Sequence, residues 1–479
     1  MTAPPTSEPL PPAFAARMRE LLGDEAAALL AALDEPRAPG VRLNPLRGSV
    51  EELAAHLPWR TDPVPWCPSG RVVAASSAEV AAHPLNDAGV FYQQDPAAMA
   101  VAEALAPVRG ELVVDVAAAP GGKATHAAGI AGDRVLVIAN DLGESRARSL
   151  LGNVERLGVT NAVVTHGPVD RLGGPLGGRA DAVLLDAPCS GEGMFRRSVS
   201  ARAAWSEAAV TRHALLQRRL IAQAADLVAP GGRLVYSTCT FDPRENEEVV
   251  AWLLERRGDF ALEPVGLAGT SGTERFGLPG AARIWPHRGV GDGHFVALLR
   301  REPAAAGSPP RRAGGPVSRG TAKGGRAARR TQHTAAEGEA AAWRAFAAAH
   351  LADGWLEGRR VERYGKHLLA LPGAFAPLQG VHVLRAGVHL GDVQSAGKLA
   401  RFEPSHALAL AAAEAWVGPV IELDGDPDAL AAFRAGGTFP ARGATGTSLV
   451  THSGFPLGFA RAEAGAARSL LPKGLRRQV

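Results

Sequence analysis

Cysteine is scarce in this sequence. Only three cysteines occur among 479 residues, Cys67, Cys189 and Cys239, and no two of them have C-x-x-C spacing. A disulfide scaffold is therefore excluded, and we expect no zinc or other metal site. In a reducing compartment, thiols of this kind remain free for chemistry.

Long apolar runs without charge are also absent. No stretch is long enough to cross a bilayer, and residues 1–5 do not form a basic region leading into an apolar core. We therefore predict neither a membrane segment nor a signal peptide, and we expect a cytoplasmic protein. The hydrophobic fraction of 46% is nevertheless typical of globular domains, and the length suggests roughly three of them.

The sequence has no strong excess of one charge, and one segment has no acidic residues. The formal net charge of +4 permits a polyanionic partner without requiring one. Between residues 303 and 336 the charged side chains are all basic: Arg311, Arg312, Arg319, Lys323, Arg326, Arg329 and Arg330. This composition cannot form a core, so it predicts a flexible basic linker over residues 302–336, acting as a tether or as a transient phosphate contact.

Residues 1–88 are predicted to form a small α+β unit. The apolar spacing from Phe14 to Leu33 is helical, and residues 41–45 are typical of a short strand. Ser49 followed by Glu52 predicts a capping box at the start of another helix.

The middle of the chain alternates short β-branched runs with helical stretches. The apolar runs are residues 112–115, 135–138, 162–164, 182–185 and 233–236, and helices are expected at 145–157 and 213–228. Strands that are apolar throughout and alternate with helices indicate a doubly wound parallel sheet, covered on both faces. A later strand, residues 294–298, is expected to pair antiparallel at the edge of this sheet.

The C-terminal section is predicted to be a separate, smaller and mostly β domain. Residues 337–352 have helical spacing, and residues 381–384 and 388–390 are typical of short strands between glycine turns.

A glycine-rich loop follows the first strand of the predicted parallel sheet. Asp115 ends that strand, and the loop runs through Gly121 and Gly122 to Lys123 before a helix begins. Such a loop lets the backbone approach a ligand at a helix N-terminus. It is neither a G-x-G-x-x-G nor a phosphate-loop motif, which disfavours nicotinamide and ATP sites. Asp141 ends the second strand, where a carboxylate accepts ribose hydroxyls of a nucleoside cofactor.

Two of the three cysteines follow predicted strands of the same sheet. Cys189 lies in the run Leu185-Asp186-Ala187-Pro188-Cys189-Ser190-Gly191-Glu192-Gly193, and Cys239 lies in Ser237-Thr238-Cys239-Thr240. Open α/β sheets place their sites at this carboxyl edge. A cysteine is usually an inert small hydrophobe, but two in polar loops at one edge favour a catalytic role.

A thiol and a carboxyl group at one edge fit methylation of cytosine at carbon 5. A thiolate that adds to carbon 6 makes carbon 5 nucleophilic toward a sulfonium methyl group, and a carboxyl group can hydrogen-bond the N3 edge of the base. We expect the site to depress the pKa of one cysteine, because the thiolate is the nucleophile. The target base must also leave its stack.

These motifs resemble those of the RNA cytosine-5 methyltransferases of the Nop/Sun family, most closely the bacterial enzymes that act on 16S ribosomal RNA. The likeness extends to C-terminal runs that look like a PUA-like module, at residues 360–365, 384–391 and 401–408. It implies an α+β RNA-binding domain at 1–88, a Rossmann-like class I methyltransferase domain at 89–301, and a mostly β, PUA-like RNA-binding domain at 337–479. The implied cofactor is S-adenosylmethionine, and the implied partner is ribosomal RNA or the small ribosomal subunit.

The resemblance also implies a role for each site residue. Cys239 is the nucleophile, Cys189 helps to resolve the covalent adduct, Asp186 contacts the cofactor or the cytosine, and Lys123 lies between them. Asp141 holds the cofactor ribose. The methionine part of the cofactor is cradled by Ala117, Ala118, Ala119, Pro120, Gly121, Gly122 and Lys123.

Several interpretations stay open at this point. The same chemistry on transfer RNA and a non-catalytic RNA-binding assembly factor are the alternatives, and a monomer is the default state. Arg196 and Arg197 are either phosphate contacts or a solvated pair, and Glu245 and Glu247 are expected to close their motif structurally. The third strand ends in His166-Gly167-Pro168, without the acidic residue that contacts adenine in many family members, and Asp170 is a weak substitute.

Overall fold

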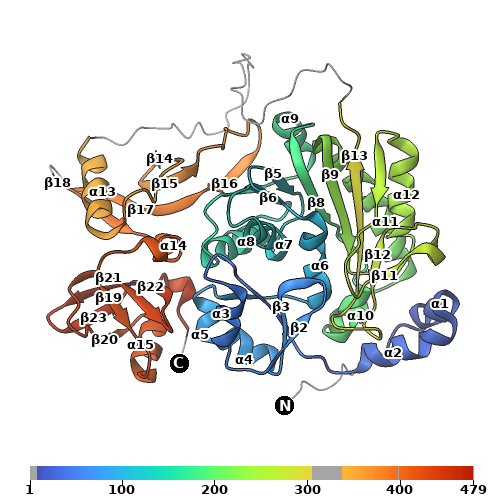
Figure 1. Ribbon diagram of the computed structural model, residues 1–479, viewed down its shortest axis with the longest axis horizontal. Helices are drawn as coiled ribbons and strands as arrows, with labels where there is room; N and C mark the ends of the chain where they lie inside the picture. The colour runs from blue at the N-terminus through green and yellow to red at the C-terminus, as the bar shows by residue number, and fades with distance from the viewer. Residues whose placement is uncertain (1–7, 305–336, 397–398, 478–479) are drawn as a thin grey trace.

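The computed structural model describes residues 8–304, 337–396 and 399–477. The basic linker predicted at 302–336 therefore lies almost wholly outside the described residues. Figure 1 shows a central sheet with helices on both sides, the N-terminal region below it and the C-terminal region beside it.

The N-terminal region is an α+β unit, as predicted. Its antiparallel sheet has the order β2-β3-β1-β4. The capping box of Ser49 and Glu52 is confirmed, whereas the helix predicted from Phe14 to Leu33 is interrupted by the turn η1 (Gly23–Glu25). The other elements are α1 (Pro12–Leu22), α2 (Ala26–Asp34), β1 (Gly40–Leu43), α3 (Val50–Ala55), β2 (Thr61–Val64), β3 (Cys67–Val73), α4 (Ser77–Ala82), α5 (Pro84–Asp87) and β4 (Phe91–Gln93). Since β4 pairs with β1, this sheet runs beyond the boundary expected at residue 88.

The central sheet contains the five predicted parallel strands. They are β5 (Leu112–Asp115), β6 (Leu136–Asp141), β7 (Ala162–His166), β8 (Ala180–Asp186) and β9 (Val228–Thr238), in the order β9-β8-β5-β6-β7. Chain order reverses between β5 and β8, which makes this pair the switch point of a doubly wound sheet. The predicted doubly wound fold is confirmed.

Helices cover both faces of this sheet (Figure 1). One face packs on α6 (Pro96–Leu105), α7 (Gly122–Ile130) and α8 (Glu144–Arg156), and the other on α9 (Asp170–Leu176), α11 (Glu207–Leu227) and α12 (Glu247–Arg256). Successive strand residues alternate between the faces, so Val113 joins the first core and Val114 the second. The turn η2 (Glu192–Arg196) and α10 (Val199–Ala204) pack instead near α1 and α2.

The strand predicted at 294–298 is β13 (His294–Arg301), and it pairs antiparallel with β9. It is not the outermost strand, because the sheet continues beyond it. Three short strands and a turn complete this side: β10 (Phe260–Glu263), β11 (Ser271–Gly272), η3 (Glu274–Phe276) and β12 (Ala282–Ile284).

The C-terminal region contains two further sheets. The first has the order β14-β15-β17-β18 and the second the order β19-β21-β22-β23-β20. The elements of the first part are α13 (Glu337–His350), β14 (Arg359–Tyr364), β15 (His367–Pro372), β16 (His382–Ala386), β17 (Val388–Ala396), β18 (Leu399–Pro404) and α14 (His406–Ala411). Those of the second are η4 (Ala413–Ala415), β19 (Val420–Glu422), α15 (Pro427–Ala435), β20 (Thr438–Pro440), β21 (Gly446–His452), β22 (Phe455–Glu463), β23 (Ala466–Ser469) and η5 (Lys473–Leu475).

The C-terminal region is not separate from the rest, contrary to the sequence-based expectation. Strand β16 joins neither C-terminal sheet but pairs antiparallel with β7, so the central sheet gains a strand from the C-terminal region (Figure 1). A hydrophobic cluster also joins Leu43 and Phe91 of the N-terminal region to Phe433 and Leu457 of the last sheet. The local sequence pattern predicted the strand correctly but not its partner.

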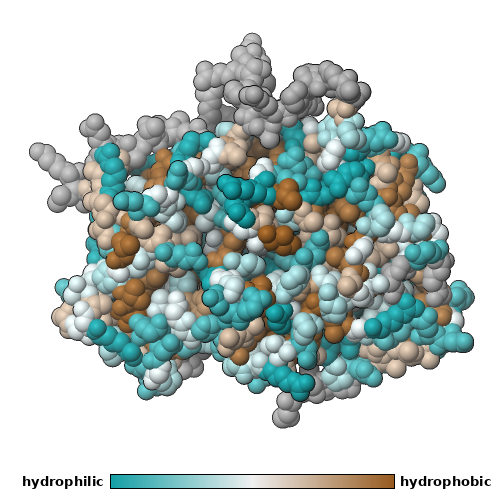
Figure 2. All heavy atoms as spheres, in the orientation of Figure 1, coloured by the Kyte–Doolittle hydropathy of each residue, from teal (hydrophilic) through white to brown (hydrophobic). Residues whose placement is uncertain are grey.

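The exposed surface is mixed in character. Figure 2 shows hydrophobic side chains on this face in small patches between hydrophilic ones. Among the described residues, none of the helices combines the length and the apolar character needed to cross a membrane.

Candidate active site

Three loops meet at the carboxyl edge of the central sheet, on either side of the switch point. The loop after β5 carries residues 117–123, the loop after β8 carries Cys189, and the loop after β9 carries Cys239. The two cysteine loops contact each other, since the Gly193 N–H donates to the Cys239 carbonyl at 2.8 Å and the Ser190 and Thr240 hydroxyls lie 2.8 Å apart. The predicted convergence of the two cysteines is therefore what the fold produces.

The two cysteines are in direct contact. Their Sγ atoms lie 3.4 Å apart and both are free thiols, since a disulfide requires about 2.05 Å. The hydrogen bond with Cys239, together with burial, raises the pKa of the Cys189 thiol well above its ordinary value. Cys189 is therefore not the thiol of depressed pKa that the chemistry requires, and it stays protonated at neutral pH.

Lys123 and Asp186 form an ion pair beside the cysteines. The Lys123 Nζ atom lies 2.7 Å from Asp186 Oδ2, and the Ser237 hydroxyl donates to Asp186 Oδ1 at 2.8 Å. Burial opposes ionisation, but the Lys123 ammonium holds the pKa of Asp186 well below its usual range. Asp186 is therefore a carboxylate that accepts hydrogen bonds.

His294 is a residue of this site that sequence reasoning missed. It begins β13, is almost fully buried, and places Nε2 at 3.4 Å from Asp186 Oδ1. Burial lowers the pKa of this imidazole, so it is neutral at physiological pH. The sequence signal for it is weak, a polar residue at the start of an apolar strand. In the structure the next residue, Phe295, pairs with Thr238, which directly precedes Cys239.

The loop at 117–123 has the features expected of a cofactor cradle. The Ala119 N–H donates to Asp141 Oδ2 at 3.2 Å, so the loop and the carboxylate at the end of β6 are already joined. Gly121 has φ 112°, and a Cβ there would lie 3.0 Å from Leu150, so the turn requires glycine. Asp141 also pairs with Arg146, whose side chain is 64% exposed and donates to the Ala119 carbonyl at 3.0 Å.

Arg42 supports this loop from the N-terminal region. It is fully buried on β1 and donates to Gln94 Oε1, to the Gly122 carbonyl and, at 3.0 Å, to the Thr125 hydroxyl. The N-terminal sheet therefore helps to fix the start of α7.

Replacing Arg42 with methionine is expected to lower the free energy of unfolding by about 2–4 kcal/mol, because buried hydrogen bonds to a charged donor are lost. Urea unfolding measures this change. The matched control is Arg71→Met on the neighbouring strand β3, whose guanidinium donates to the Pro68 and Gly70 carbonyls and whose loss should cost under about 1 kcal/mol. Equal effects of the two changes would contradict this role for Arg42.

Asp115, at the end of β5, makes stability depend on pH. Burial raises the pKa of Asp115 to about 7, and its Oδ2 atom has no hydrogen-bond partner among the described residues. The folded state therefore holds a proton that the unfolded chain has lost, so stability falls as pH rises from about 4 to about 7. We expect Asp115→Asn to flatten this decline, which amounts to about 1.4 kcal/mol per unit of pKa shift. Urea unfolding at several pH values measures the slope, and equal slopes would contradict the assignment.

Glu245 anchors the loop that carries Cys189 by hydrogen bonds. Its Oε2 atom accepts from the Ser190 N–H at 3.0 Å and from Gln217 Nε2 at 2.8 Å, and burial raises the pKa of this carboxyl to about 7. Glu247 is paired with the buried Arg283 at 2.7 Å. Both glutamates therefore make structural contacts that close the motif.

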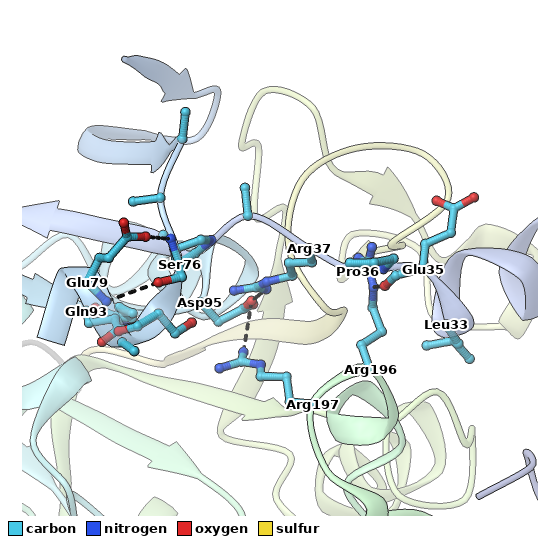
Figure 3. Close-up of a pocket in the computed structure, with 18 of the residues that line it drawn as sticks. Leu33, Glu35, Pro36, Arg37, Ser76, Glu79, Gln93, Asp95, Arg196 and Arg197 are labelled. Carbon is cyan, nitrogen blue, oxygen red and sulfur yellow. Dashed lines mark hydrogen bonds and ion pairs between the residues drawn. The ribbon is translucent and has the colours of Figure 1, made fainter. Parts of the chain in front are cut away.

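A cleft of about 1120 Å³ opens between the N-terminal region and η2 (Figure 3). Its arginines are already paired: Arg37 and Arg197 both contact Asp95, the latter at 3.0 Å. Arg196 is only 10% exposed and donates to the carbonyls of Glu35 and Gly291. Arg196 is thus not a solvated side chain, whereas Arg197 is 40% exposed and pairs with Asp95.

Sequence comparisons divide the chain as the fold does. Residues 10–96 match the N-terminal domain of 16S rRNA methyltransferase RsmF, and residues 102–300 match 16S rRNA methyltransferase RsmB/F. Residues 345–411 match the RsmF first C-terminal domain, and residues 420–477 match the RsmF PUA domain. Ribosomal RNA small subunit methyltransferase F of Erwinia tasmaniensis is 32% identical over 97% of this chain and 96% of its own length. The chain belongs to the RsmF family.

Other members of the RsmF family give the same result. The protein of the same name from Enterobacter sp. is 32% identical over 97% of this chain and 95% of its own length. That from Serratia proteamaculans is 37% identical over 61% of this chain and 63% of its own length. The chain is thus a ribosomal RNA cytosine-5 methyltransferase that depends on S-adenosylmethionine, which confirms the interpretation from the motifs.

Solved structures share the catalytic fold of the RsmF family. A methyltransferase homolog from Pyrococcus horikoshii is 32% identical, covers 60% of this chain and 94% of its own, and has a TM-score of 0.53. NSun6 from the same organism, solved with SFG, has a TM-score of 0.54 at 24% identity, covering 61% of this chain and 99% of its own. The second likeness concerns the fold alone.

Proposed function

We propose that this chain methylates carbon 5 of cytosine in 16S ribosomal RNA with Cys239 as the nucleophile and Cys189 as the residue that resolves the adduct. The observation that carries the proposal is the 3.4 Å contact between the two thiols beside the pair of Lys123 and Asp186. One thiol can reach carbon 6 while the other lies within reach of carbon 5.

The electrostatics of the site favour Cys239 as the attacking thiol. Although burial opposes it, Asp186 and also Cys239 raise the pKa of the Lys123 ammonium, so this cation and a Cys239 thiolate attract each other. Cys189, by contrast, stays a thiol in the resting enzyme because Cys239 raises its pKa. A thiolate is the better nucleophile, and of the two thiols Cys239 is the one whose charge the Lys123 ammonium would stabilise.

The same coupling makes Cys189 available at the later step. Once the Cys239 sulfur is bonded to carbon 6, it carries no charge and no longer raises the pKa of Cys189. Cys189 then releases its proton to water and takes the proton from carbon 5. The ring regains its double bond as Cys239 leaves as a thiolate, and the proton released to water is the one that the overall reaction produces.

Asp186 and Lys123 are proposed to hold the cytosine. Because Asp186 is ionised, it accepts a hydrogen bond from the exocyclic amino group, and Lys123 is the donor toward N3. The negative charge that develops on the ring during thiolate addition is stabilised by this ammonium.

The cofactor is proposed to lie along the loop of residues 117–123, with its ribose on Asp141. The methyl group on its sulfonium is the chemistry that it supplies. The loop amides and the N-terminus of α7 hold the methionine part, with Asp186 at the boundary between cofactor and base.

Ribosomal RNA is favoured over transfer RNA by the match to RsmF domains along the whole chain, PUA domain included. We further propose that the protein acts as a monomer in the cytoplasm, on the RNA or on the assembled small subunit. Incubation with labelled cofactor and 16S RNA, small subunits or transfer RNA tests the substrate. Transfer to transfer RNA alone, or to none of the three, would contradict the proposal and favour the transfer RNA enzyme or the assembly factor.

A further inference from the structure

The C-terminal region reaches the cofactor side of the catalytic sheet through β16. This strand runs antiparallel to β7, so its first residue lies at the carboxyl end of β7. That is the edge at which open α/β sheets bind their ligands. His382, more than 200 positions from the cofactor loop in sequence, is thus brought to the edge on which Asp141 lies.

Asp141, His166 and His382 form one row across three neighbouring strands. Asp141 pairs with His166 in the register of β6 and β7, and His166 pairs with His382 in the register of β7 and β16. Paired residues of adjacent strands point to the same face of a sheet, and each strand is about 4.8 Å from the next. His382 therefore lies about 10 Å from Asp141, on the same side.

The two imidazoles contact each other, and one of them is accessible to a ligand. Their ring centroids are 5.7 Å apart in an edge-to-face arrangement. His382 is exposed, and His166 Nδ1 is buried without a hydrogen-bond partner among the described residues. A Cβ on the next residue, Gly167, would meet no atom within 4 Å, so the space at the end of β7 is open.

We propose that His382, together with His166, forms the wall of the cofactor site that contacts the adenine base. The inference rests on the proposed position of the cofactor, whose ribose lies on Asp141. It accounts for the missing acidic residue at Gly167 and Pro168, because the polar and aromatic contact comes from the next strand instead. Cofactor binding then depends on a strand of the C-terminal region.

Calorimetric titration of the full chain with S-adenosylhomocysteine, without RNA, tests this inference. We expect His382→Ala to weaken binding by about five- to tenfold, the loss of one aromatic contact of about 1 kcal/mol. KM for S-adenosylmethionine should rise by the same factor, while kcat at saturating cofactor stays unchanged. The matched control is Val383→Ala, on the same strand but packed into the opposite core, which should leave the affinity within twofold.

Two results would overturn the inference. One is a His382→Ala protein that binds S-adenosylhomocysteine within twofold of wild type. The other is an equal loss in Val383→Ala, because a general loosening of β16 would then explain both. Failure of the wild-type protein itself to bind S-adenosylhomocysteine would instead contradict the cofactor position under the proposed function.

Discussion

Replacing Cys239 with alanine is expected to reduce methyl transfer to RNA by at least about 10⁴-fold, because no other group can form the bond to carbon 6. Cys189 lies 3.4 Å away, on the carbon 5 side of the base in the proposed arrangement, so it does not substitute. Single-turnover transfer of labelled methyl groups to 16S RNA measures the loss.

Cys67→Ala is the matched control for this experiment. Cys67 is the third cysteine, buried on β3 with its sulfur 3.7 Å from His126 Nε2, and it belongs to the core rather than to the site. Its replacement should lower stability by about 1 kcal/mol and leave methyl transfer unchanged. A Cys239→Ala protein with more than a tenth of wild-type activity would show that Cys239 is not the nucleophile.

Replacing Asp186 with asparagine is expected to reduce kcat by about 10²–10³-fold. The amide keeps the shape of the side chain but removes the charge that holds Lys123 and that accepts from the cytosine amino group. In this variant the buried Lys123 loses its main counter-charge, so the pKa of its ammonium falls and its protonated fraction decreases. The pH profile of kcat in the variant should therefore decline at lower pH than in wild type.

Asp181→Asn is the control for Asp186→Asn, because Asp181 lies on the same strand at its other end. There it accepts from the Leu112 N–H at 2.8 Å, away from the site. Its replacement should leave both kcat and the pH profile as in wild type. A kcat for Asp186→Asn within threefold of wild type would contradict the role of this carboxylate.

Local patterns in the sequence predicted most of the catalytic fold, because each strand of a covered parallel sheet has to be apolar on both faces. Residues 182–185 and 233–236 therefore stood out without any tertiary information, and the loops after them had to share one edge. The convergence of Cys189 and Cys239 follows from that rule alone.

The pairing of strands that are distant in sequence could not be predicted, because local patterns do not indicate the partner of a strand. The pattern of residues 382–386 is that of a short strand whichever sheet it joins, so nothing local indicates pairing with β7. Arg42 is the one polar residue of the short strand β1 and His294 is the first residue of β13, and their partners Gly122 and Asp186 lie far away in sequence. The role of a buried arginine or histidine can be assigned only once the groups that surround it are known.

The central claim is that the two cysteines divide the chemistry between them. Its most direct test is a denaturing gel of wild type, Cys189→Ala, Cys239→Ala and the double variant after incubation with 16S RNA and cofactor. We predict a covalent protein–RNA band that accumulates in Cys189→Ala and is absent from both proteins that lack Cys239. A band in Cys239→Ala but not in Cys189→Ala would contradict the account and exchange the roles of the two thiols.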